Sequence, residues 1–233
     1  MGTSSPYYKP QMKLFDMISS DHDLLHILER LGIKLGFGDN TNAEVCHKYD
    51  LSIDLFLMIC NIYSFEEYQP NIDILRQNDI PRIISYLQAS HRYYIEKFFP
   101  QLHELIHTMV TDLDEVNRNV LNRFYDNYDT EVINHFAYEE QQVFPYVESL
   151  LGNRSDCQSE YHIGKFEENH SNIEEKLNDL KSIIIKYIPE ESTTDNSYSV
   201  VDHIFKIERD LKKHSLIENK LLIPLVSKFE QNE

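Results

Sequence analysis

HFAYEEQQVFPYV at residues 135–147 and HSLIENKLLIPLV at residues 214–226 are two copies of one pattern, offset by 79 residues. Both copies read H-x3-E-[EN]-x3-[FI]-P-x-V. Within the copies this offset pairs Glu139 with Glu218 and Pro145 with Pro224, and outside them it also pairs His91 with His170. Self-similarity at a fixed period is the mark of a structure built from repeated units. The pattern therefore predicts a domain whose second half mirrors its first.

Both copies of this pattern lie within long segments that have the apolar spacing of helices. They cover residues 79–110, 114–151, 160–188 and 198–230. Breaks at TDLD, GNRSDC and PEESTTDNS separate them. Because connections this short favour antiparallel neighbours, we predict an all-α protein with an up-down four-helix bundle over residues 79–233.

A small helical N-terminal domain is predicted ahead of the bundle, over residues 1–65. It contains LLHILERLGI, the Gly-rich break LGFGDN, and helical candidates around NAEVCHKY and SIDLFLMICNIY. The stretch SFEEYQPNID is polar and broken by Pro70, which is typical of a linker. We place this linker at residues 66–78.

The charge and the hydropathy argue against nucleic-acid and membrane partners. Lys and Arg number 22 against 39 Asp and Glu, a formal net charge of -17 that repels phosphate backbones and anionic lipids. The start, MGTSSPYYKPQMKLFD, has no apolar core of signal-peptide length. No apolar run approaches the roughly 20 residues of a membrane helix. We expect a cytoplasmic protein.

The cysteines do not form a recognisable redox or metal motif. Cys46, Cys60 and Cys157 contain no CxxC pair, and their odd number argues against a disulfide framework. We interpret all three as buried or idle thiols.

Polar residues on the apolar stripes of the bundle helices are candidate metal ligands. They are His91, His135, Glu139, His170, His214 and Glu218. Residues four apart on a helix share a face, so each His-x3-Glu pair can aim a nitrogen and a carboxylate at one point. One such pair arises often by chance, and any single histidine of the set is more readily explained as a satisfied core residue.

The positions of all six residues together favour a metal centre. At 100° per residue, the stripe of His91 contains Ile84, Leu87, Ile95, Phe98, Leu102 and Met109. The other candidates share similar apolar stripes. Burying four imidazoles and two carboxylates costs free energy unless they are hydrogen-bonded or bound to a cation. Glu140 competes with Glu139 as a ligand, but its repeat partner is Asn219, so the symmetric choice is Glu139.

The ligand types favour two non-haem iron ions, with manganese or zinc as substitutes. Nitrogen and oxygen ligands without thiolate suit iron or manganese better than a structural zinc site. Two near-octahedral ions have about twelve positions, of which four imidazoles and two bridging carboxylates fill about eight. An oxo or hydroxo bridge fills roughly two more. About one open position per iron then remains for NO, O2 or peroxide.

Two other histidine groups are less suited than these six residues to bind the metal. His103 and His107 form an H-x3-H pair that could bind zinc, but they lie about 120° and 160° around the helix from His91, which favours a solvated face. His203 shares the stripe of His214 at roughly 16 Å along the helix, too far for the same centre. His203 could instead line an access path to the centre, but we favour the alternative that it is a core histidine.

The motifs SHRYYIEKFFPQL, HFAYEEQQVFP, ENHSNIEE and HSLIENKLLIP resemble those of hemerythrin-like domains. The whole chain resembles the iron-sulfur cluster repair di-iron proteins of bacteria. This resemblance implies that the four histidines bind two irons and that Glu139 and Glu218 bridge them. Oxygen-carrying hemerythrins differ, because they use an extra histidine and an H-x4-D ending that this sequence lacks.

The leading segment LERLGIKLGFGDNTNAEVCHKYDLS resembles the ScdA-type first domain of that family, including its A-E-x-C segment at Ala43–Cys46. That family usually has a Cys-Cys pair after the LGI segment. Gly36 and Phe37 stand there in this chain. The resemblance therefore carries over no thiol redox or metal-transfer role for such a pair.

The resemblance implies repair of iron-sulfur clusters damaged by nitric oxide or oxidants, through iron delivery or reaction with NO at the di-iron centre. The alternative is a protein that binds or senses O2 or NO without turnover, which the missing Cys-Cys pair favours. A third, weaker interpretation is iron storage or a purely structural bundle. The expected partners are a small ligand and iron-sulfur proteins. Enzymatic turnover and the oligomeric state, with a homodimer as one option, stay open.

Overall fold

The computed structural model describes residues 6–152, 161–169 and 173–231. Within these ranges the secondary structure is helical, apart from an isolated antiparallel bridge between Lys13 and Thr41. The predicted all-α class is confirmed. The chain divides into two compact units, Met1–Ala89 with Ser215–Glu233, and Ser90–His214. In the part of the chain described, no helix combines the length and the apolarity needed to cross a membrane.

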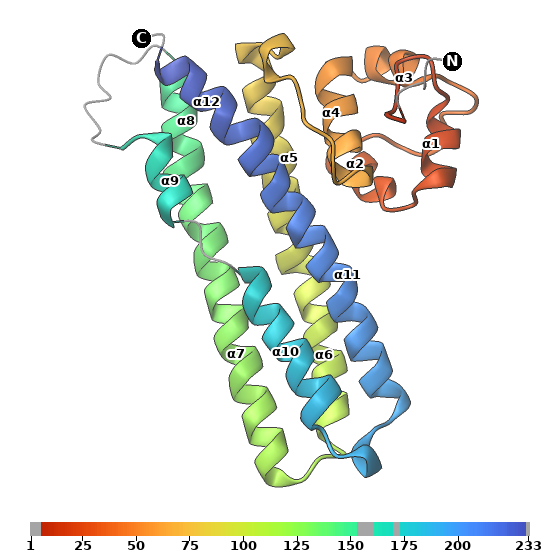
Figure 1. Cartoon of the computed structure of the whole chain (residues 1–233), viewed down its shortest axis with the longest axis vertical. Helices are drawn as coiled ribbons and strands as arrows, with labels where there is room; N and C mark the ends of the chain where they lie inside the picture. The colour runs from red at the N-terminus through yellow and green to blue at the C-terminus, as the bar shows by residue number, and fades with distance from the viewer. Residues whose placement is uncertain (1–5, 153–160, 170–172, 232–233) are drawn as a thin grey trace. The chain divides into compact units, whose positions relative to one another are not determined.

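Antiparallel helices form the unit of Ser90–His214. Those that run side by side, with successive helices in opposite directions (Figure 1), are α6 (Phe99–Val110), α7 (Glu115–Tyr138), α10 (Ile173–Tyr187) and α11 (Asp195–Ile217). Each contributes apolar side chains to one buried core, for example Leu102, Leu121, Leu177 and Leu211. The predicted apolar stripes therefore meet in a common interior.

The turn between α6 and α7 shows how the sequence sets a short connection. The Asp114 carboxylate accepts hydrogen bonds from the backbone N–H groups of Val116 and Asn117, at 2.9 and 3.0 Å. These bonds satisfy donors that the first turn of α7 would otherwise leave unpaired. Arg118 donates from Nε to the Val110 carbonyl at the end of α6. The break predicted at TDLD is thus a capped turn.

The long predicted segments correspond to nearly continuous helix. The first consists of α5 (Ile80–Tyr93), the π-helical turn η3 (Tyr94–Phe98) and α6. The second consists of α7, the π-helical turn η4 (Glu139–Val143) and α8 (Phe144–Leu151). The third contains α9 (Ile163–Asn169) and α10, and the fourth contains α11, the π-helical turn η6 (Glu218–Leu222) and α12 (Ile223–Glu230).

The N-terminal part of the chain forms short helices. They are α1 (Leu14–Ser20), α2 (Leu24–Arg30), α3 (Asn42–Lys48) and α4 (Ile53–Ser64), followed by the 3-10 turns η1 (Ile72–Ile74) and η2 (Gln77–Asp79). A further 3-10 turn, η5 (Glu190–Ser192), precedes α11. Buried Arg30 donates to the Tyr63 hydroxyl at 2.5 Å, and the Tyr86 hydroxyl donates to Tyr63 at 2.8 Å. This network ties α2 and α4 to the first part of α5.

The described thiols are buried, as predicted. Cys46 and Cys60 are each 1% exposed. Burial raises the pKa of Cys46 to about 12 and the pKa of Cys60 well above its usual value. Cys157 lies outside the described residues. Since the thiolate is the reactive form, both described thiols should be inert in the folded protein.

We expect the Cys157→Ser protein to show no thiol reaction with an aromatic disulfide reagent over minutes at pH 8. After unfolding in guanidinium chloride, both remaining thiols should react. Absorbance of the released thiolate measures both states. Rapid reaction of either thiol in the folded protein would contradict the burial of this part of the chain.

Candidate metal centre

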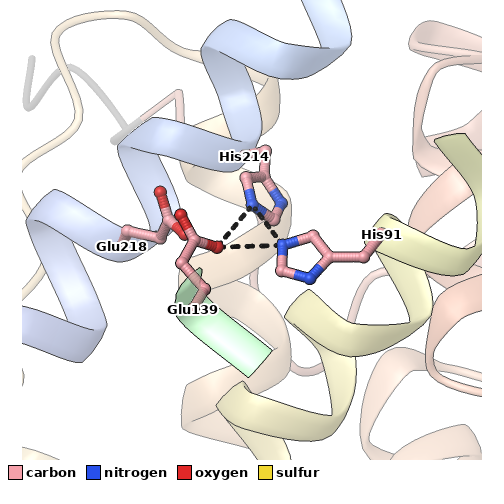
Figure 2. Close-up of side chains that lie close together, drawn as sticks. All are labelled: His91, Glu139, His214 and Glu218. Carbon is pink, nitrogen blue, oxygen red and sulfur yellow. Dashed lines mark hydrogen bonds and ion pairs between the residues drawn. The ribbon is translucent and has the colours of Figure 1, made fainter. Parts of the chain in front are cut away.

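Four of the candidate ligands lie together in the structure. They are His91 on α5, Glu139 at the start of η4, His214 on α11, and Glu218 one turn further along the helix from His214. Each offers a ligand atom, and these atoms lie within 4.8 Å of one another. All four side chains are at most 2% exposed. Figure 2 shows both imidazoles turned toward the Glu139 carboxylate.

Glu139 occupies the middle of this cluster. Its Oε1 lies 2.8 Å from Nε2 of His135, and its Oε2 lies 3.0 Å from Nε2 of His91. Nε2 of His214 is 4.0 Å from the same Oε2. The two oxygens therefore face different histidines, which is the arrangement that a carboxylate bridging two cations requires.

The charge state of Glu139 is suited to metal binding. Burial alone would raise the pKa of this carboxyl, but the neighbouring imidazoles of His135, His214 and His91 hold the pKa well below its usual range. The group is consequently ionised at neutral pH. An ionised carboxylate is the form that coordinates a cation.

The spacing of the donor atoms fits metal ions. Nε2 of His91 lies 3.2 Å from Nε2 of His214 and 3.0 Å from the Glu139 carboxylate. Bonds of about 2 Å from a metal to nitrogen and oxygen keep neighbouring ligand atoms about 3 Å apart. Two carboxylates at 0% exposure are also costly to bury without cations. The nitrogen and oxygen donors suit iron or manganese.

The remaining two candidates differ in what the structure says of them. His135 is 8% exposed and reaches the cluster through its contact with Glu139. His170 lies outside the described residues, so its place in the centre stays a prediction. Metal binding by the whole set of six also stays a prediction.

A proline follows each π-helical turn of the described chain. The residue before the proline donates its N–H to the carbonyl five residues back: Phe99 to Tyr94, Phe144 to Glu139, and Ile223 to Glu218. Proline has no N–H, and its ring clashes with the carbonyl four residues back, so the helix widens there. Two of these turns begin at Glu139 and Glu218. The Glu-to-Pro spacing of the repeat thus sets the backbone at both carboxylates.

The π-helical turn also explains one wrong prediction. At 100° per residue, Ile95 should share the inward stripe of His91, yet it is 42% exposed. The turn beginning at Tyr94 interrupts the period of 3.6 residues just after His91. Sequence periodicity therefore places His91 correctly on the buried face, but it wrongly places Ile95 on that face too.

Pro145→Ala should remove the constraint that favours the turn at Glu139. We expect metal affinity to fall at least tenfold while the fold is retained, because alanine allows an ordinary helical hydrogen bond and rotates Glu139 within the cluster. Titration with iron(II) measures the affinity. Pro81→Ala is the matched control, since Pro81 lies in the first turn of α5, where its missing N–H breaks no helical bond. Equal affinities in both variants would contradict this role.

Residues outside the cluster largely follow the sequence predictions. His103 and His107 are exposed, in agreement with a solvated face. His203 is half-buried, and its ring stacks on Phe98 with centroids 3.9 Å apart. Glu140 has a contact that the sequence did not reveal, because its Oε1 lies 2.9 Å from Nδ1 of His91. The sequence signal for this contact is an acidic residue next to a candidate ligand, Glu139.

Comparisons with known proteins agree with this architecture. The family model of the hemerythrin HHE cation binding domain matches residues 82–226. The iron-sulfur cluster repair protein ScdA of Staphylococcus haemolyticus (strain JCSC1435) is 23% identical over 201 residues, which cover 84% of this chain and 89% of that protein. No solved structure gave a significant match. Since the family match spans more than half of the chain and all six candidate ligands, the chain belongs to the hemerythrin HHE family.

Proposed function

We propose that this chain is a non-haem di-iron protein that helps to repair iron-sulfur clusters damaged by nitric oxide or oxidants. The observation that carries the proposal is the buried cluster of His91, Glu139, His214 and Glu218 in a hemerythrin-type domain. The similarity to a protein named for iron-sulfur cluster repair, over most of both chains, supports repair as the setting.

In this proposal the six residues hold the irons and their surroundings keep water out. Glu139 and Glu218 would supply carboxylate oxygens to the ions, and His91, His135, His170 and His214 would supply nitrogen. The bound irons supply redox chemistry and an exchangeable position for NO, O2 or peroxide. Buried Tyr94 and Phe136 border the His214 ring at 5.8 and 6.0 Å between centroids. Such apolar walls limit solvent access to the site.

The first experiment is metal analysis of freshly purified protein together with its ultraviolet-visible spectrum. About two irons per chain and absorption typical of a bridged ferric pair are expected. The second adds the iron-loaded protein to extract in which NO has damaged an iron-sulfur dehydratase. Recovery of dehydratase activity is expected, and no recovery beyond that given by an equal amount of free iron would refute repair by this protein.

A second candidate function is binding or sensing of O2 or NO without turnover. The observation that favours it lies in the loop after α2, where Gly36 and Phe37 replace a Cys-Cys pair and Gly36 adopts a φ of +87°. Cys46 and Cys60, the described thiols, are buried. NO consumption over many turnovers would eliminate this alternative. Stoichiometric, reversible NO binding with no repair of damaged clusters would favour it.

A further inference from the structure

A surface pocket of about 210 Å³ lies where η3 and α6 pack against α7. Side chains from these three elements line it: Ile95, Phe99, Pro100, His103, Asp129 and Ile133. None of them is a candidate metal ligand. The π-helical turn η3 helps to form the pocket, because it leaves Ile95 on the surface at 42% exposure. Ile133 on α7 is 44% exposed. The pocket therefore offers apolar surface that a ligand can reach.

One carboxylate lies among these apolar side chains. Asp129 on α7 is half-buried. Among residues 6–152, 161–169 and 173–231, its side chain has no hydrogen bond and no ion pair. His103 is the other ionisable residue of the pocket, and its ring packs near Tyr125 rather than pairing with the carboxylate, with centroids 5.7 Å apart. The carboxylate of Asp129 is thus without a counter-charge in direct contact.

The charge at the pocket favours a cationic ligand. Burial raises the pKa of Asp129, His103 acts in the opposite direction, and nearby Asp126 raises the pKa again. A carboxylate that is partly removed from water is stabilised by a charged hydrogen-bond donor at the same place. The net charge of the chain, -17, repels anions and attracts cations to its surface. A neutral or anionic ligand would leave Asp129 without compensation.

The size of the pocket limits the ligand to a small molecule. Sites for drug-sized ligands measure roughly 300–1,000 Å³, whereas a cavity of about 150 Å³ holds benzene. A volume of about 210 Å³ therefore has room for one ring, or a short branched chain, that carries a single charged group. Two exposed isoleucines and Pro100 supply the apolar contacts that such a body needs.

We propose that this pocket binds a small amphipathic cation, a primary ammonium group on a single ring or a short branched apolar chain. Asp129 accepts hydrogen bonds from the ammonium group, and Ile95 and Ile133 contact the apolar body. The site is separate from the proposed di-iron centre, since the two share no residue. Its occupation therefore does not depend on the metal.

Methyl NMR of the full-length protein tests this proposal, with isoleucine methyl groups labelled and zinc supplied in place of iron to keep the resonances sharp. The probe is benzylammonium, and its neutral counterpart is benzyl alcohol, which has nearly the same shape. Benzylammonium should shift the Ile95 and Ile133 resonances of the wild type saturably. Benzyl alcohol should bind about tenfold more weakly, because it lacks the charge that pairs with Asp129.

Asp129→Asn should weaken the binding of benzylammonium about tenfold and leave that of benzyl alcohol unchanged. Asp126→Asn is the matched control, because it removes the same charge from an exposed position one turn earlier on α7, and its affinity should stay near that of the wild type. Unshifted Ile95 and Ile133 resonances in the wild type, or equal affinities for the ammonium and the alcohol, would overturn the proposal. Equal losses in the two variants would also overturn it, since attraction to the overall negative charge would then explain the binding. Isoleucine resonances outside the pocket check the fold of each variant.

Discussion

His214→Ala protein should contain at most half of the iron found in the wild type. His214 is 1% exposed and lies 3.2 Å from Nε2 of His91, at the centre of the cluster. Its removal takes away one nitrogen donor and so weakens binding of the cation that offsets the burial of two carboxylates. We expect the affinity of the position it serves to fall by at least about 100-fold, beyond the range seen for supporting residues alone.

The matched control is His203→Ala on the same helix. His203 is half-buried and stacks on Phe98, but it is not part of the cluster. Iron per chain, measured on protein purified under identical conditions, should remain near the wild-type value in this variant. His135→Ala should resemble His214→Ala, because His135 contacts Glu139 at 2.8 Å. Full iron content in both cluster variants would refute the assignment of these ligands.

Glu139 is expected to act on the pair of ions rather than on one of them. Its oxygens face His135 and His91 separately, so Glu139→Ala should uncouple the two irons as well as weaken their binding. Magnetic susceptibility of the iron-loaded variant would detect loss of coupling. Coupling equal to that of the wild type would show that another group provides the bridge.

The sequence predicts the helices and the inward-facing polar residues well, because both follow from periodicity. His91, His214, Glu139 and Glu218 stand on apolar stripes, and helices whose stripes face one core must bring such residues together. The 79-residue offset strengthens this inference, since chance rarely matches polar ligands and a proline in two copies. The fold and the cluster can thus be predicted from the spacing of apolar and polar residues along the helices.

What the sequence did not predict depends on departures from that rule. The π-helical turn after His91 exposes Ile95, and a period of 3.6 residues cannot anticipate where a helix widens. The hydrogen bond from His91 to Glu140 depends on the approach of two helices and on side-chain rotamers. To predict the exposure of Ile95 and the hydrogen bond to Glu140, the proline positions and the neighbours of each ligand would have to be considered together.

Removal of the metal should lower the thermal stability of the bundle substantially. Ligands on α5, η4, α11 and η6 come from distant parts of the sequence, so cations at this point bind the folded state and not the unfolded chain. At a free metal concentration of about 1,000 times Kd, such binding stabilises by about 4 kcal/mol. For a chain of this size, that corresponds to a shift in Tm of about 8–16 °C.

Calorimetric scans with and without a chelator at pH 7 measure this shift, and the His214→Ala protein serves as the control in which it should largely vanish. The shift should shrink as the pH falls toward 5, because protons compete with cations for the imidazoles. In the metal-free protein, the lowered pKa of Glu139 adds stability above the ordinary carboxyl pKa, which is lost as pH falls through the lowered value. A chelator that leaves Tm unchanged at pH 7 would mean that the buried carboxylates are balanced by histidines alone, without cations.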